Sequence, residues 1–245
     1  VSQLLFYFKK AHYQTILINA NPNSVAMTPQ LAAKRYIEPK QVSDILNVLA
    51  VEQPEVIFTT YHDYRLGQQL TKLGYQVVQI NNGLPREQIK TNDSPAVEVI
   101  TDGSDVAIFG ISEIIAGNNL RSGVHGSVSV FPIQDKAENQ AIAALSTEIK
   151  QRVLAFGVPG LYTVRLTIVD EALHLATIEP MSLATMALIS KASGSSVTRL
   201  LLHVKLGESL DKVMYDYPDM ANLKTIFVQA NTFPYNQLQI YDEDE

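Results

Sequence analysis

Short apolar segments alternate with helical patterns through the first 80 residues, and this alternation constrains the fold more than any other feature. The predicted elements are, in order, a helix at 1–8, a strand at 15–20 (TILINA), a helix at 43–51, a strand at 56–60 (VIFTT), a helix at 64–73 and a strand at 76–80. Strands that alternate with helices form parallel sheets with crossover connections. The sequence therefore predicts a parallel α/β unit, and we expect the strand that would precede its first helix to be missing.

The pattern changes after residues 81–95, which are rich in Asn, Gly, Pro, Lys and Asp and predict a linker. Beyond it we expect strands at 96–101, 105–115 and 127–131, a helix at 135–156, strands at 161–169 and 172–178, helices at 182–192 and 195–205, and a strand at 225–228. Turn residues between these strands favour antiparallel pairing. Three parts are predicted: an α/β domain at 1–83, a second domain at 94–214, and a tail at 215–245 containing one strand.

Composition excludes several classes of protein. Hydrophobic residues make up 46% of the 245 residues and charged residues 18%, so the chain has enough apolar side chain to fold around a core. The chain contains no Cys, which excludes disulfides and thiolate zinc sites. A net charge of −6 argues against a nucleic-acid partner.

The distribution of apolar residues argues against a membrane segment. The longest apolar run, residues 106–111, is far shorter than the roughly 18 residues that span a bilayer. Residues 1–8 lack the basic start and small-residue cleavage site of a signal peptide. We therefore expect a cytoplasmic protein.

Isolated motifs for catalysis are absent from the sequence. The five histidines have no metal-ligand spacing, and no GxSxG, Walker or GxGxxG motif occurs. The richest loop, residues 122–127 (SGVHGS), could hold a phosphate or an adenine with its backbone amides. An ordinary connection between two strands explains the same composition equally well.

Several short motifs occur along the chain in the same order as in one known family. They are 19–22 (NANP), 27–29 (MTP), 36–39 (YIEP), 96–99 (AVEV), 102–103 (DG), 123–125 (GVH), 190–194 (SKASG), 206–211 (LGESLD) and 225–238 (TIFVQANTFPYNQL). Together they resemble the carbamoyl-phosphate synthetase large subunit, in its first, carboxyphosphate-forming half. The resemblance implies a pre-ATP-grasp (Rossmann-like) parallel α/β domain followed by an α+β ATP-grasp domain. That family uses ATP and two magnesium or manganese ions to phosphorylate bicarbonate.

The sequence departs from the family pattern in three segments. The family's opening glycine-rich strand and loop have no counterpart, and residues 61–65 (YHDYR) replace its GGQT motif. Only residues 81–95 occupy the interval that holds the lid subdomain in the family. We therefore expect an incomplete ATP-grasp domain that lacks its lid, so that one side of its sheet is uncovered and ATP loses the cover that excludes water from its phosphates.

The fourth departure concerns the metal site. The resemblance places the family's metal-site Gln, Glu, Asn and Arg at Arg165, Thr177, Glu179 and Met181. Hard cations bind several oxygen ligands, and here Glu179 is the one carboxylate left, so we expect no metal and no intact catalytic residue. Strand alternation puts Thr177 and Glu179 on one face, and we predict an ion pair between Glu179 and Arg165 on the neighbouring strand.

Four further residues match positions that contact the nucleotide in the family. They are Glu98, Gly123, Val124 and His125. Weak binding of adenine or ribose could survive through them.

Two functional hypotheses follow. In the first, the chain is a catalytically inactive relative that needs no cofactor and acts as a binding or interaction module, as a homodimer or with a carbamoyl-phosphate synthetase subunit. In the second, it is an active ATP-dependent ligase that uses ATP and Mg²⁺ and whose site is completed by another chain.

Overall fold

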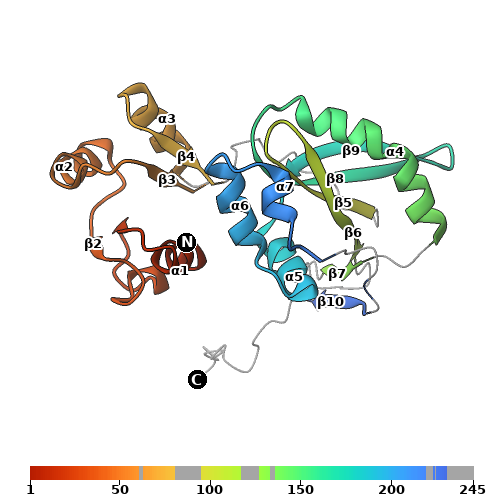
Figure 1. The fold of residues 1–245 in the computed structure, drawn as a ribbon, viewed down its shortest axis with the longest axis horizontal. Helices are drawn as coiled ribbons and strands as arrows, with labels where there is room; N and C mark the ends of the chain where they lie inside the picture. Colours follow the sequence, from red (N-terminus) through yellow and green to blue (C-terminus); the bar gives the residue numbers. More distant parts are fainter. Residues whose placement is uncertain are drawn as a thin grey trace, which may run out of the picture.

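The computed structural model describes residues 1–60, 63–80, 95–116, 127–132, 136–218, 223 and 225–230. Parallel strand pairs and helices form the first part of the chain, and an antiparallel sheet covered by helices forms the second (Figure 1). The predicted fold class, a parallel α/β segment followed by an α+β ATP-grasp-like segment, is confirmed. No helix in this described part is long and apolar enough to cross a bilayer.

The first part follows the predicted order with one strand added. Its elements are α1 (Ser2–Lys10), β1 (Ile16–Ile18), the 3₁₀ helix η1 (Val25–Met27), β2 (Lys34–Tyr36), α2 (Val42–Glu52), β3 (Ile57–Thr59), α3 (Tyr64–Lys72) and β4 (Val77–Gln79). The strand β2 was missed because its three residues, KRY, carry two charges and show no apolar run. Gly74 has φ +91°, the left-handed conformation expected at the end of α3.

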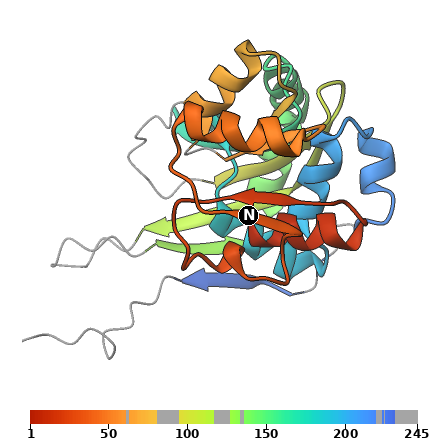
Figure 2. The same cartoon turned by 90° about the vertical axis from the view of Figure 1, so that its left-hand side faces the viewer.

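The parallel strands form two separate pairs. β1 pairs with β2, and β3 pairs with β4, both in parallel register. The same helices contact both pairs. On one face α1 packs Leu5 near Leu17 of β1 and Phe8 against Phe58 of β3. On the other face, a cluster from α2 and α3 contacts Ile18 of β1 and Ile57 of β3. Figure 2 shows this part in front, with α1 and β1 in red and α2 and α3 in orange.

A six-stranded antiparallel sheet dominates the second part of the chain. Its strands are β5 (Pro95–Thr101), β6 (Val106–Ala116), β7 (Ser127–Phe131), β8 (Gly160–Val169), β9 (Ala172–Pro180) and β10 (Phe227–Ala230). The spatial order is β10-β7-β6-β5-β8-β9, so β10, expected in the tail, closes one edge of this sheet. Asp170 and Glu171, at φ +49° and +64°, form the predicted turn between β8 and β9.

Helices cover both faces of the sheet. The long helix α4 (Lys136–Leu154) packs on one face through Ile142, Ile149 and Val153, against valines of β5 and β8. The other face is covered at one end by α5 (Leu183–Ser193), α6 (Val197–Lys205) and α7 (Leu210–Met214), as Figure 1 shows. On α4 the sequence predicts an inner face of Ala141, Ala144, Leu145, Ile149 and Val153. The prediction is wrong for Ala144, which is exposed while Ile142 is buried, and the side chain of Ala141 lies outside the described part of the structure.

Asp102 connects the β5–β6 hairpin to α7. Its Oδ1 accepts the backbone N–H groups of Ser104 and Asp105, both at 2.8 Å, and its Oδ2 accepts the N–H of Leu210 at 2.7 Å. Burial raises the pKa of this carboxyl, but the backbone hydrogen bonds outweigh burial and lower the pKa from 3.8 to about 2. The carboxylate therefore stabilises the fold only while it is ionised.

Replacing Asp102 with Asn tests this role. Hydrogen bonds to a charged acceptor contribute about 1.5–3 kcal/mol each, so we expect Asp102→Asn to lower the free energy of unfolding at pH 7 by about 2 kcal/mol. A carboxyl whose pKa is lowered on folding loses its contribution as the pH falls through that pKa. The difference from the unmodified chain, measured by urea denaturation, should therefore shrink between pH 4 and pH 2. The control Asp211→Asn, at an exposed carboxylate of α7, should change stability little; an equal loss there would contradict the account.

Candidate functional site

A patch of polar side chains crosses four strands on the sheet face opposite α4. Side chains two apart on a strand share a face, and the strand register aligns these residues in rows across β6, β5, β8 and β9. One row is Gly110, Glu98, Thr163 and Glu179, and the neighbouring row is Ser112, Ala96, Arg165 and Thr177. The patch therefore brings together three of the four predicted metal-site positions and the predicted nucleotide-site residue Glu98.

Arg165 and Glu179 form an ion pair within this patch. The guanidinium Nε of Arg165 donates to Oε1 of Glu179 at 2.9 Å. Both side chains are largely buried, with 21% and 20% of their surfaces exposed, so the pair is screened less than a surface pair. The structure thus contains the predicted ion pair between Arg165 on β8 and Glu179 on β9.

Thr177 lies directly opposite Arg165 in the strand register. Its hydroxyl oxygen is buried and, among the described residues, has no hydrogen-bond partner. Met181 follows β9 on the same face but is only 3% exposed, packed beneath α5 and α6 with Leu161 and Met186. The fourth predicted metal-site position is therefore part of the apolar core.

Glu98 is the most deeply buried charged residue of the patch, with 1% of its surface exposed. Its Oε1 accepts the hydroxyl of Ser112 and its Oε2 accepts the hydroxyl of Thr163, both at 2.6 Å. Burial raises the pKa of the carboxyl, against the lowering effect of the two hydroxyls and of the charge on Arg165. Each carboxyl oxygen thus accepts one hydroxyl from the protein, and burial leaves almost no surface for a ribose to reach.

Sequence reasoning missed Ser112 and Thr163. The strand alternation contained the signal, because Thr163 lies two residues before Arg165 and directly opposite Glu98. Ser112 could be found only from the register between β5 and β6, which includes an irregularity after Glu98 that sequence alone does not show.

The other predicted nucleotide-site residues, Gly123, Val124 and His125, lie outside the described residues.

The expectation of an uncovered sheet is wrong at the centre of this face. All seven residues of β5 are buried, and Ser112 and Thr163 are each only 3% exposed. The paired hydroxyls and carboxyl allow these polar groups to be buried, since each hydrogen-bonding group has a partner. The proposed absence of a lid concerns residues 81–94, which the structure does not describe, and it stays a prediction.

Gly110 supports the same region from β6. It lies opposite Glu98, and a Cβ at this position would be 2.8 Å from Cζ of Phe131, whose ring is fully buried. A side chain here would displace the Phe131 ring. Glycine therefore allows β7 to pack its aromatic ring close to β6 beside the buried carboxyl.

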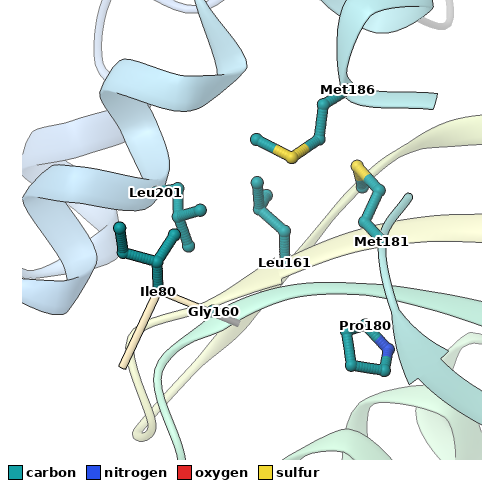
Figure 3. Close-up of a pocket in the computed structure, with 7 residues that line it drawn as sticks. All are labelled: Ile80, Gly160, Leu161, Pro180, Met181, Met186 and Leu201. Carbon is teal, nitrogen blue, oxygen red and sulfur yellow. The ribbon is translucent and has the colours of Figure 1, made fainter. Parts of the chain in front are cut away.

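A small apolar pocket lies at the junction of the two parts of the chain. Its walls are Ile80, Gly160, Leu161, Pro180, Met181, Met186 and Leu201, as Figure 3 shows. Its volume of about 10 Å³ is close to the minimum for one water molecule, and none of its walls is ionisable. Ligand pockets are usually several hundred Å³, so this pocket is a packing feature between β4 and the second part.

The described residues contain no group of three or more His, Asp or Glu side chains that could hold a metal ion. In the polar patch, Glu98 faces two hydroxyls and Glu179 faces a guanidinium. The residues present therefore do not fit the hard-cation site that the family resemblance implies, because such a site needs several free oxygen ligands.

Comparisons with known proteins agree with the architecture. Residues 1–81 match the family model of the carbamoyl phosphate synthase preATP-grasp domain. The match covers the two parallel strand pairs and α1 to α3, where the motifs NANP and YIEP occur.

Solved structures are similar over most of the chain. The glycinamide-RNase-transformylase T of Mycobacterium tuberculosis is 12% identical with a TM-score of 0.58, covering 85% of this chain and 77% of that chain. The biotin carboxylase domain of a single-chain bacterial carboxylase is 10% identical with a TM-score of 0.63, covering 86% and 66%. The pyruvate carboxylase of Rhizobium etli is 14% identical with a TM-score of 0.64, covering 92% of this chain but only 25% of that chain.

These structural similarities establish the fold alone. The class of protein is one with a pre-ATP-grasp-like α/β segment joined to an ATP-grasp-like antiparallel sheet. Within that class, the first 81 residues are similar to carbamoyl phosphate synthase.

Glu98→Gln tests whether Glu98 is a buried acid satisfied by its own hydroxyls. A carboxyl whose pKa is raised on folding costs stability as the pH rises from 4.5 through its folded pKa, because the folded state holds its proton longer. We expect Glu98→Gln to remove this loss, so that its urea midpoint rises relative to the unmodified chain between pH 4.5 and pH 8. Glu55→Gln, at an exposed carboxylate, should show no such trend. If the urea midpoint of Glu98→Gln falls relative to that of the unmodified chain as the pH rises, the assignment is wrong.

Proposed function

We propose that this chain is a carbamoyl-phosphate-synthetase-like protein of the ATP-grasp class that does not catalyse phosphoryl transfer and acts as a binding or interaction module. The Arg165–Glu179 ion pair is the observation that carries the proposal. It places a fixed organic cation where, by the family resemblance, two metal ions would be held.

Electrostatics support the loss of metal. A divalent ion next to Glu179 would have to displace the Arg165 guanidinium or approach a positive charge at short range. The position opposite, Thr177, offers a neutral hydroxyl in place of a carboxylate. Phosphoryl transfer depends on metal ions that neutralise the charge on the transferred phosphate, so a patch without them gives little catalysis.

The state of Glu98 supports weak nucleotide binding at best. To reach this carboxyl, which is 1% exposed, a ribose would have to displace the side chains around it, including Ser112 and Thr163, each bound to the carboxyl at 2.6 Å. Breaking those bonds leaves buried hydroxyls without partners, which costs about 1–3 kcal/mol for each group. The alternative of a ligase completed by another chain requires the same rearrangement together with release of the Arg165 pair.

The partner class follows from the same resemblance. We propose a second copy of the chain or a subunit of a carbamoyl-phosphate synthetase as the partner, with neither ATP nor Mg²⁺ as a required cofactor and with a cytoplasmic location.

Rebuilding the ligand set tests the proposal. The double variant Arg165→Gln and Thr177→Glu removes the guanidinium and supplies a second carboxylate beside Glu179. We expect it to bind Mn²⁺ at least about tenfold more tightly than the unmodified chain, a gain of about 1.4 kcal/mol, measured by calorimetry and by the electron paramagnetic resonance signal of free Mn²⁺.

The matched control is Arg165→Lys with Thr177→Glu, which keeps the positive charge and should gain much less affinity. Circular dichroism melts show whether each variant folds. Micromolar Mn²⁺ binding by the unmodified chain would overturn the proposal without any variant.

A further inference from the structure

An Asp-Gly pair, Asp102 and Gly103, lies at the turn of the β5–β6 hairpin. Such a pair is chemically labile in an unfolded chain, because the amide nitrogen that follows an aspartate can attack the carboxyl carbon of its side chain. Glycine has no Cβ to hinder this approach, so Asp-Gly reacts faster than other aspartyl pairs. The sequence contains this pair once.

The reaction proceeds in two steps. First, a bond forms between the Gly103 nitrogen and Cγ of Asp102, and the amide proton leaves with the carboxyl OH as one molecule of water. Water then opens the resulting succinimide ring at either carbonyl, which gives aspartate again or isoaspartate, in which the main chain runs through Cγ. The first step requires the neutral acid, because a carboxylate is a poor electrophile.

The attacking nitrogen is held by Thr101. The Gly103 N–H donates to Oγ1 of Thr101 at 2.9 Å, and this hydroxyl donates to the backbone carbonyl of Asp105 at 2.6 Å. Thr101 is only 1% exposed, so water competes little for its hydroxyl. The two hydrogen bonds fix the peptide plane between Asp102 and Gly103, and this plane has to rotate before the nitrogen can reach Cγ.

The carboxyl group is held separately. Oδ1 of Asp102 accepts the backbone N–H and the hydroxyl of Ser104 and the N–H of Asp105, each at 2.8 Å, and Oδ2 accepts the N–H of Leu210 at 2.7 Å. Burial raises the pKa of this carboxyl, but the hydrogen bonds outweigh burial and lower the pKa to about 2. At pH 7 the reactive neutral acid is therefore at least about tenfold rarer in the folded chain than in the unfolded chain.

We propose that the turn of the β5–β6 hairpin is a protected modification site, at which the fold suppresses conversion of Asp102 to isoaspartate and Thr101 is the positioning residue that holds the attacking nitrogen. Part of this protection comes from a distant segment, since Leu210 follows Asp102 by 108 residues. The site is therefore protected only while β5, β6 and α7 keep their native arrangement.

Isoaspartate at residue 102 separates the hairpin from α7. The modification adds one methylene to the main chain and moves the free carboxylate, so the 2.7 Å hydrogen bond from Leu210 is lost. Leu210 is buried in the apolar cluster formed by α5, α6 and the sheet, and α7 is therefore held less firmly after the modification. The inference goes beyond the proposed function, since it holds whether or not the polar patch binds a metal ion.

The rate of isoaspartate formation tests the proposal on the full chain. The chain is incubated at pH 7.4 and 37 °C, folded in buffer or unfolded in urea, and isoaspartate at residue 102 is measured by electron-transfer mass spectrometry of its peptides. We expect the folded chain to accumulate isoaspartate at least about tenfold more slowly than the unfolded chain. Folded Thr101→Val, which keeps the shape of the side chain without the hydroxyl, should react at least about threefold faster than the folded unmodified chain.

The matched control is Thr101→Ser, which keeps the hydroxyl and should react at nearly the rate of the unmodified chain. In urea the three chains should react at the same rate, because the hydrogen bonds of the turn are absent there. Amide exchange at Gly103 is a second readout, and it should be faster in Thr101→Val than in Thr101→Ser.

Two results would overturn the proposal. One is a folded chain that reacts less than about tenfold more slowly than the unfolded chain. The other is a folded Thr101→Val that reacts no faster than Thr101→Ser. If circular dichroism shows that Thr101→Val does not fold, the comparison of folded and unfolded unmodified chain decides. Neither readout involves a metal ion or a nucleotide, so this test and that of the proposed function fail independently.

Discussion

The ion pair between Arg165 and Glu179 is the interaction on which the proposed function of the central sheet depends. Both side chains are mostly buried on adjacent strands, so neither can leave its partner without exposing a charge to a poorly solvated environment. The pair also acts on Glu98 in two opposite ways: the charge of Arg165 lowers the pKa of its carboxyl, while the charge of Glu179 and, most of all, burial raise it. Arg165 thus compensates the carboxylate of Glu179, while the hydroxyls of Ser112 and Thr163 satisfy the carboxyl of Glu98.

Much of the fold followed from sequence periodicity, and the failures have physical causes. Predictions succeeded where apolar runs were clear, as for β7, β8 and α4. They failed where polar residues occupied a strand, as in β2, and where a helix was very short, as in α7 (Leu210–Met214). The Arg165–Glu179 pair could be predicted because strand alternation and the family motifs gave the register. The Glu98 partners could not, because they depend on pairings between distant strands.

Each part of the chain has one notable feature among its strands. In the sheet, a side chain occupies the place where the resemblance puts metal ions. In the parallel part, α1 and the α2–α3 cluster contact both β1 and β3, and no strand pairing joins these two strands among the described residues. The proposed role as a binding or interaction module rests on the first of these features.

Calorimetric titration of the intact chain with ATP in the presence and absence of Mg²⁺ tests the central claim most directly. If an arginine has taken over the role of the metal ions, any heat of nucleotide binding should be weak, with Kd in the millimolar range, and independent of Mg²⁺. A micromolar affinity that requires the divalent ion would show that the sheet still assembles a metal–nucleotide site, and the account of an inactive scaffold would be wrong.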